Sequence, residues 1–207
     1  MDPVLTPLVV PLTVSDSIIL TPLDTSKAGT LLSLVQKERE REIEQGVERE
    51  HTLSERLPWL SSIHTLEDAV SYIEDTPSRR HVEGGGPGDW LIVVTPSGSD
   101  TQTHTDTAVG VIGVSSVSLD KKCAELGYWL GLGSEGHGYV TQCGQAVVEH
   151  LFRQNISRIE VHVSFENVRS RAVPERLGFR QLDVSEEMCG CSQGKWAVYG
   201  IDRDNRG

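Results

Sequence analysis

Basic residues are scarce in this sequence. It has 19 lysines and arginines against 30 aspartates and glutamates, which gives a formal net charge of −11. Nucleic acids and anionic membranes both require a basic face on the protein that binds them, so neither is expected as the main partner. The acidic balance is compatible with a cationic partner such as an amine or a basic peptide, although it also simply favours solubility.

Long hydrophobic runs and clustered cysteines are missing as well. No apolar stretch approaches the ~20 residues that span a bilayer. Residues 1–14 are apolar, but they lack the basic leader of a signal peptide and contain three prolines. The four cysteines, Cys123, Cys143, Cys189 and Cys191, have no spacing typical of a structural zinc site. We therefore expect free thiols, no metal and a cytoplasmic protein.

The order of the remaining patterns predicts one mixed α/β domain of the α+β type. No repeat or linker divides the chain, so we expect an N-terminal arm at 1–16 and a single domain at 17–203. Strands are expected at 17–20, 90–95, 108–118, 124–132, 158–164, 179–184 and 195–201, and helices at 27–50, 65–74, from 140 onward and at 168–177. Three consecutive strands, 90–132, indicate an antiparallel meander.

The helix expected at 27–50 changes character along its length. Its first half has an apolar face formed by Leu31, Leu34 and Val35, whereas residues 37–50 are almost wholly charged. A charged stretch of this kind predicts a solvated helix face or a mobile segment, because unpaired charges are rarely buried. An arm that binds a partner protein is the alternative.

A glycine-rich segment between a predicted strand and a predicted helix is the best candidate for chemistry. Residues 131–139 read Gly-Leu-Gly-Ser-Glu-Gly-His-Gly-Tyr. Glycine lets the backbone approach a ligand closely, and the helix that follows begins with unpaired N–H groups and a positive dipole end. These features suit a pyrophosphate. A tight structural turn explains the same residues, and the spacing does not fit a Gly-x-Gly-x-x-Gly dinucleotide motif.

Four short motifs give the chain a resemblance to a known family. They are Gly127-Tyr128-Trp129-Leu130, Gly136-His137-Gly138-Tyr139, Asn167 with Ser170, and Arg176-Leu177-Gly178-Phe179. In order and spacing they resemble the GNAT N-acetyltransferase superfamily, and its Rim-like branch of ribosomal-protein N-terminal acetyltransferases in particular. The resemblance implies a mostly antiparallel central sheet with two parted central strands, flanked by helices. It also implies acetyl-CoA as co-substrate and direct attack of an amine on the thioester.

The resemblance also implies roles for individual residues. Backbone groups near Leu130 would face the thioester oxygen, and Ser170 matches a position proposed to protonate the leaving thiolate. Glu186 or Glu187 stands where the branch places a carboxylate that takes the proton of the amine. The implied cofactor-binding set is Leu130, Leu132, Gly133, Ser134, Gly136, His137, Gly138, Tyr139 and Asn167. Acceptors would be protein N-termini or small amines, and monomer and homodimer both stay open.

Two residues depart from the family pattern. Gly133 stands where many members carry Gln or Arg. Pro174 falls inside the helix that begins after Asn167, where it deletes a backbone hydrogen bond to Ser170 and is expected to kink the helix. Both departures motivate the alternative of a catalytically inactive acyl-CoA-binding or interaction module. His162, on the polar side of the strand at 158–164, either lines the substrate cleft or faces solvent.

Overall fold

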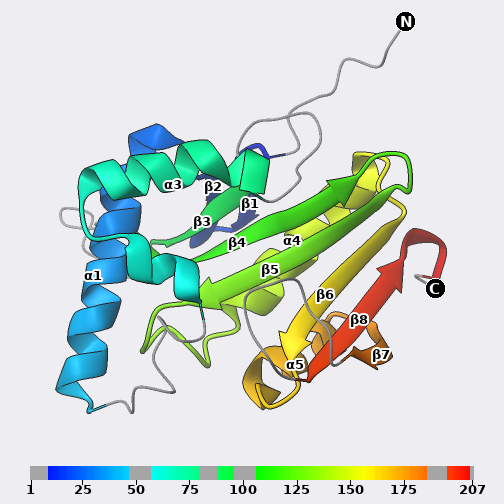
Figure 1. Ribbon diagram of the computed structural model, residues 1–207. Helices are drawn as coiled ribbons and strands as arrows, with labels where there is room; N and C mark the ends of the chain where they lie inside the picture. The colour runs from blue at the N-terminus through cyan, green and yellow to red at the C-terminus, as the bar shows by residue number, and fades with distance from the viewer. Residues whose placement is uncertain (1–8, 47–56, 80–87, 96–105, 186–194, 206–207) are drawn as a thin grey trace, which may run out of the picture.

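One eight-stranded sheet organises the protein, which we describe from a computed structural model (Figure 1). The structure describes residues 9–46, 57–79, 88–95, 106–185 and 195–205. The strands are β1 (Leu12–Ser15), β2 (Ile18–Pro22), β3 (Asp89–Val94), β4 (Thr107–Ser118), β5 (Cys123–Leu130), β6 (Arg158–Ser164), β7 (Arg180–Ser185) and β8 (Trp196–Asp202). Their order across the sheet is β1-β2-β3-β4-β5-β6-β8-β7, so β8 enters between β6 and β7.

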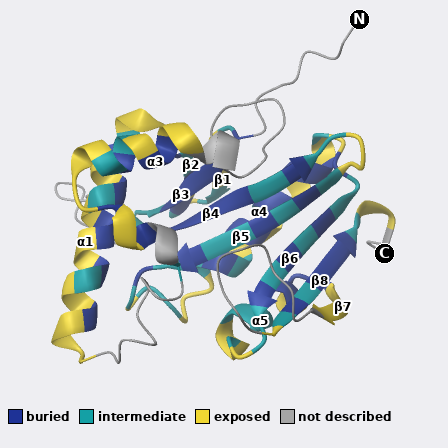
Figure 2. Ribbon diagram, in the orientation of Figure 1, coloured by how far each residue is buried: buried dark blue, intermediate teal, exposed yellow. Residues whose placement is uncertain are grey.

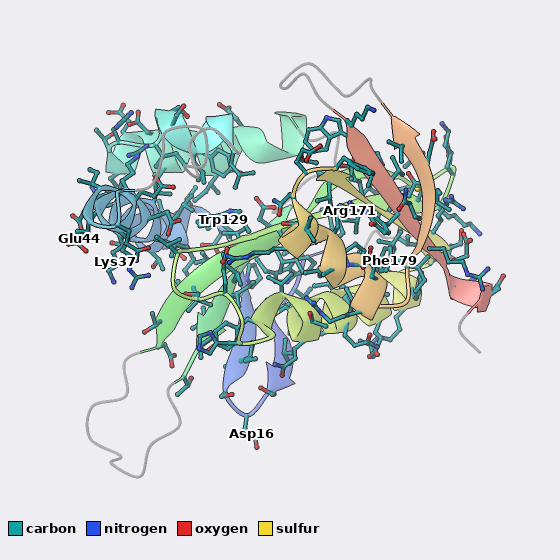
Figure 3. All side chains as sticks on the ribbon, turned by 90° about the horizontal axis from the view of Figure 1, so that it is seen from below. Asp16, Lys37, Glu44, Trp129, Arg171 and Phe179 are labelled. Atoms are coloured by element: carbon teal, nitrogen blue, oxygen red, sulfur yellow. The ribbon has the colours of Figure 1, made fainter. Side chains whose placement is uncertain are left out.

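Helices cover both faces of this sheet. They are α1 (Ala28–Glu44), α3 (Leu66–Arg79), α4 (Tyr139–Arg153) and α5 (Val168–Arg176), with the 3-10 turns η1 (Thr25–Lys27), η3 (Pro58–Ser62) and η4 (Arg203–Asn205). The helices α1 and α3 lie on one face, and α4 and α5 lie on the other (Figures 1 and 3). No helix in the described ranges combines the length and the apolar character that a membrane crossing requires.

Strict alternation along the strands produces two separate cores. Leu91, Val111 and Trp129 pack with α1 and α3, whereas their neighbours Trp90 and Ile112 pack with α4. Figure 2 shows the resulting bands of buried residues across the sheet, and Figure 3 shows Trp129 on the side of α1 and α3. Each face therefore has its own layer of helices, and any site in the sheet is approached from one layer or the other.

The expected meander is confirmed, and an edge strand is added to it. β3, β4 and β5 pair antiparallel in sequence order. Residues 12–15, which the sequence placed in the extended arm, form β1 and pair with β2. The helix expected from residue 65 begins with a capping box: Thr65 Oγ1 accepts from the Asp68 N–H at 3.1 Å, and Asp68 accepts from the Thr65 N–H at 2.8 Å.

β5 and β6 pair only at their beginnings, which confirms the predicted parting. They run parallel and share three rungs, Cys123–Arg158, Ala124–Ile159 and Glu125–Glu160. Beyond Glu125, β5 continues along β4 alone and β6 continues along β8 alone. We call this divergent region the strand parting: residues 126–130 of β5 opposite residues 161–164 of β6. Figure 1 shows the two arrows separating toward α5.

The charged half of α1 is partly buried, so the expectation of a solvated or mobile segment was wrong there. Glu38 and Glu42 are only 2% and 7% exposed. Arg39 donates to the carbonyls of Leu60 and Ile63, each at 2.7 Å. The Leu132 N–H donates to the Glu38 carboxylate. Burial is tolerated because the charged groups meet backbone groups of η3 and of the glycine-rich segment, which no periodicity in the helix could reveal.

Candidate active site

The glycine-rich segment 131–138 leads from β5 into the N-terminus of α4. Gly133, Gly136 and Gly138 have φ angles of 83°, 81° and 76°, a region that favours glycine. Gly138 is the N-cap of α4, and it makes no side-chain capping hydrogen bond. The first backbone N–H groups of a 15-residue helix therefore have no side-chain cap at the end of the parted strand. This arrangement is chemically suited to an anion.

Other residues of the segment already have partners. The Gly131 N–H donates to the Val109 carbonyl at 2.9 Å, and the Ser134 N–H donates to the Gly131 carbonyl at 3.0 Å. Leu132 is held at both ends by α1, because its N–H donates to Glu38 and its carbonyl accepts from Arg41. Among the residues predicted to bind the cofactor, Leu132 therefore has both its backbone N–H and its carbonyl bonded to side chains of α1. The glycine at 136 is exposed, and a Cβ there would have no atom within 4 Å.

An aromatic pair closes the segment. The rings of His137 and Tyr139 are stacked, with centroids 5.2 Å apart and planes 11° apart. The His137 Nδ1 also lies 3.4 Å from the Ser134 carbonyl. These contacts give His137 a role in shaping the turn, and Tyr139 begins α4 directly after it.

Leu130, the last residue of β5, has its N–H directed into the strand parting. Successive N–H groups of an extended strand point to opposite edges. Because the Gly131 N–H bonds to Val109 in β4, the Leu130 N–H points to the opposite edge, where β6 has moved away. The same alternation directs the Tyr128 backbone to that edge. A ligand lying in the parting would therefore meet unpaired backbone groups of β5.

Asn167 and Ser170 lie on α5, beside the parting. Asn167 is the N-cap of α5, and its Oδ1 accepts from the Ser170 N–H at 3.1 Å. Arg171 secures the helix by donating to the Tyr199 hydroxyl and to the Phe165 carbonyl, each at 3.1 Å. Figure 3 shows Arg171 and Phe179 on the side of the sheet opposite α1 and α3. The structure thus brings Ser170 to the face that carries α4.

Tyr128 replaces the hydrogen bond that Pro174 removes from α5. Pro174 is buried within α5 and has no N–H to donate to the Ser170 carbonyl. That carbonyl instead accepts from the Tyr128 hydroxyl at 2.8 Å. Burial raises the pKa of Tyr128 well above its usual value, so the hydroxyl stays a donor. One hydrogen bond therefore connects β5 to α5 and anchors Ser170.

An ion pair joins α5 to the glycine-rich segment. Arg169 Nη1 lies 2.5 Å from the carboxylate of Glu135. Arg176, about two turns further along α5, donates to the Thr141 hydroxyl at 3.2 Å. Two cationic side chains of α5 therefore stand close to the N-terminus of α4, and one carboxylate stands among them.

Three titratable side chains gather on the opposite face of the sheet, where the parting begins. Glu125 and Glu160 form the last shared rung of β5 and β6, and His162 follows on the same face. His162 Nε2 lies 3.4 Å from Glu160 Oε2, and its Nδ1 lies 3.9 Å from Glu125 Oε1. Burial opposes ionisation of Glu160, but hydrogen bonds from Arg158 and His162 hold its pKa below the usual value.

Sequence reasoning left the role of His162 open and missed the two carboxylates. Alternation in the strand at 158–164 did put Glu160 and His162 on one face. Glu125 joins them only through the register of two strands that lie far apart in the chain, and register is a tertiary property. Glu186 and Glu187, the carboxylates that the resemblance implied, lie outside the described residues.

Two of the four cysteines lie within the described ranges, whereas Cys189 and Cys191 lie outside them. Cys123 and Cys143 are free thiols. Burial raises the pKa of Cys143 to about 12, so it is an inert packing residue and not a nucleophile. Among the residues the structure describes, no group of three or more His, Cys, Asp or Glu side chains is arranged to hold a metal ion.

Comparison with known sequences identifies one family along most of the chain. The acetyltransferase (GNAT) domain matches residues 18–180. The ribosomal-protein-serine acetyltransferase of Escherichia coli is 32% identical over 75 residues, which are 36% of this chain and 42% of that protein. A Bacillus licheniformis protein named uncharacterized N-acetyltransferase p20 is 31% identical over 79 residues, 38% of this chain and 44% of that protein. The matched part spans about two fifths of these curated relatives.

Solved structures share the whole fold. The microcin C7 self-immunity acetyltransferase MccE, solved with acetyl-CoA and AMP, has a TM-score of 0.68 and 21% identity, over 97% of this chain and 99% of that one. The ribosomal L7/L12 alpha-N-protein acetyltransferase RimL, solved with coenzyme A, has a TM-score of 0.71 and 19% identity, over 94% and 99%. At such identities the likeness concerns the fold, and it confirms the mixed sheet predicted from the sequence.

Proposed function

Because the chain belongs to the GNAT acetyltransferase family, we propose that it transfers an acetyl group from acetyl-CoA to an amine. The observation that carries this proposal is the parting of β5 and β6 beside the N-terminus of α4, which has no side-chain cap. A diphosphate requires unpaired backbone N–H groups and a positive helix end, and the amides of a pantetheine arm require an unpaired strand edge. One short segment, from Tyr128 to Tyr139, offers both.

Each residue of the proposed cofactor side has its own role in binding acetyl-CoA or in the transfer. The backbone of β5 receives the pantetheine arm, and a backbone N–H near Leu130 that points into the parting, that of Tyr128 or of Leu130, faces the thioester oxygen as negative charge develops there. The diphosphate lies against the amides of residues 133–139, with Leu132 supporting the turn: the contributing residues are Gly133, Ser134, Gly136, His137, Gly138 and Tyr139. Asn167 orders the start of α5, and the Ser170 hydroxyl protonates the leaving thiolate.

A protein N-terminus is the acceptor we propose. Support comes from the names of the relatives: a ribosomal-protein-serine acetyltransferase in Escherichia coli, and RimL, an alpha-N-protein acetyltransferase. The net charge of −11 also suits an acceptor that arrives as an ammonium ion. A reducing, cytoplasmic setting belongs to the same proposal, and the free thiols of Cys123 and Cys143 support it.

The rival function is an acyl-CoA-binding module without catalysis. Glu135 favours it, because a carboxylate in the glycine-rich segment repels phosphates, and the ion pair with the exposed Arg169 offsets that repulsion only in part. Pro174, which raised the same doubt from the sequence, supports it less, since the Ser170 carbonyl has a replacement partner in Tyr128. Both functions require acetyl-CoA binding, and only the enzyme releases a free thiol.

Two measurements on the full chain test the proposal. Calorimetric titration with acetyl-CoA is expected to show binding, and the melting temperature is expected to rise with ligand concentration. A peptide beginning with serine, a peptide beginning with alanine, and spermine are then supplied in turn with acetyl-CoA. The enzyme is expected to release CoA thiol and to add one acetyl group to an acceptor, as followed by a thiol reagent and by mass spectrometry. Binding without thiol release would support the rival, and no binding would reject both.

A further inference from the structure

The acetyl transfer proposed above needs a group that removes the proton of the amine, and the strand parting has a candidate at its start. Glu125 and Glu160 are the last residues that face each other across β5 and β6. His162 lies two residues further along β6, on the same face and within the region where the strands diverge. The three side chains therefore surround the point at which the sheet opens.

This face of the sheet is the one from which an amine can reach a thioester in the parting. The other face is closed by the core beneath β5 and β6, since Ala124, Leu126, Ile159 and Val161 pack there with α4. The side chains of Glu125, Glu160 and His162 are 31%, 26% and 25% exposed. They are therefore held by neighbours but still accessible to a ligand.

The contacts fix the orientation and the tautomer of the imidazole. A carboxylate only accepts hydrogen bonds, so Nε2 of His162 carries the hydrogen that points to Glu160 Oε2 at 3.4 Å. Glu160 is itself held through Oε1 by Arg158 Nε at 2.8 Å. The neutral ring then has its lone pair on Nδ1, on the side that faces Glu125.

The space between Nδ1 and Glu125 suits one ammonium group. Nδ1 lies 3.9 Å from Glu125 Oε1, which is too far for a direct hydrogen bond. A single nitrogen about 2.9 Å from each atom would donate to both of them. Glu125 is positioned for this by the Ser116 hydroxyl, which donates to its Oε2 at 3.4 Å.

The surrounding charges favour a cation at this place. The charged groups around the start of the parting are Glu125 from β5, Arg158 and Glu160 from β6, and Asp202 from β8, which lies 3.2 Å from Arg158; of these, Glu125 and Glu160 face His162. Three carboxylates thus face one guanidinium. Burial raises the pKa of the Cys123 thiol, and the negative charge of Glu160 raises it further. The second effect agrees with an excess of negative charge at this place. An incoming ammonium would therefore reduce the excess of negative charge among these groups.

We propose that His162 is the proton acceptor for the amine, with Glu125 binding the ammonium and Glu160 positioning the imidazole. The ammonium gives one proton to Nδ1 of His162, which later passes it to solvent. The neutral nitrogen attacks the thioester carbonyl, so the C–N bond forms and the C–S bond breaks. The second proton lost from the nitrogen balances the thiolate, which leaves as CoA thiol. The two carboxylates stabilise the transient imidazolium.

The pH dependence of a glutamine variant tests this assignment. His162→Gln is assayed for kcat with acetyl-CoA and a peptide beginning with serine, between pH 6.5 and pH 9. We expect a loss of roughly 10²–10⁴-fold at the acid end, the range typical of a removed general base. The loss is expected to shrink as pH rises, because solution then supplies the neutral amine. A purely structural role would give a loss that does not vary with pH.

Controls separate this inference from the proposed function. His64→Gln removes an exposed histidine that lies between η3 and α3, outside the strand parting, and is expected to leave kcat unchanged; acetyl-CoA affinity is expected to stay the same in both variants. Glu125→Gln is expected to raise the KM for the peptide more than it lowers kcat, and it serves as a second test should His162→Gln not fold. If the wild type is active and His162→Gln keeps its rate at pH 6.5, only the role of His162 is refuted. A wild type that binds acetyl-CoA without transferring its acetyl group refutes both proposals.

Discussion

The two faces of the strand parting are built by different means. On the proposed cofactor side, segment 131–138 and the start of α4 offer mainly backbone groups from residues that are close in sequence. On the proposed amine side, Glu125, Glu160 and His162 are side chains that meet only because β5 and β6 share a register. A site made of backbone groups can be predicted from glycines and helix caps in the sequence. A site made of side chains on two strands depends on how those strands pair, which the sequence does not show directly. Mutations should therefore affect the two faces separately.

The largest expected effect is on the cofactor side, at Gly136. Gly136→Asp forces a non-glycine residue into a φ of 81° and puts a negative charge where the phosphates are proposed to lie. The strain is expected to lower the free energy of unfolding by about 1–3 kcal/mol, and the repulsion predicts a loss of acetyl-CoA affinity of about 100-fold. Calorimetric titration measures it directly.

Gly46→Asp is the matched control for that variant. Gly46 also has a positive φ, 60°, and a Cβ there would likewise have no atom within 4 Å, but it follows the C-terminus of α1. It is expected to lower stability by a similar amount and to leave acetyl-CoA affinity unchanged. Equal losses of affinity in the two variants would remove segment 131–138 from the cofactor site.

The second prediction concerns the hydrogen bond that joins β5 to α5. Tyr128→Phe leaves the Ser170 carbonyl without the donor that replaces the missing Pro174 N–H, and it should lower the free energy of unfolding by about 1–3 kcal/mol. Pro174→Ala restores a backbone donor, so the loss from Tyr128→Phe should become smaller in the double variant. Urea unfolding of the four proteins gives the coupling energy. Additive effects would mean that Tyr128 does not substitute for the backbone bond.

The features on which the proposed cofactor side rests are local. The glycines of 131–138 and the strand–helix order around them depend on neighbours within a few residues, and the structure has both as predicted. The same reasoning recognised that Pro174 breaks a bond but could not find Tyr128, which lies 42 residues away from its partner Ser170. It also misjudged α1, because the backbone groups that accept Arg39 and meet Glu38 come from η3 and residue 132.

That misjudged contact supplies the third prediction. Glu38→Ala removes the buried carboxylate that accepts from the Leu132 N–H, and it should lower the free energy of unfolding by about 1–2 kcal/mol. Acetyl-CoA affinity should fall by less than in Gly136→Asp, since Leu132 supports the turn without contacting the phosphates. Glu40→Ala, an exposed position on the same helix, is the control and is expected to be neutral. A neutral Glu38→Ala would mean that α1 does not brace the cofactor side.

The smallest expected effect belongs to the capping box of α3, in the α1–α3 layer. Thr65→Ala should lower the free energy of unfolding by about 1 kcal/mol at neutral pH.

Backbone hydrogen bonds from His64 and Thr65 hold the pKa of Asp68 below its ordinary value of 3.8. A carboxyl whose pKa is lower when folded stabilises the protein above its unfolded pKa, and this contribution disappears as pH falls through the folded pKa. The stability difference between wild type and Asp68→Asn should therefore be constant above about pH 5 and shrink in more acidic solution. Glu67→Gln, in the same first turn, controls for the loss of a negative charge at the helix N-terminus. A difference that persists unchanged below pH 3 would show that the Asp68 side chain acts through its shape and not through its charge.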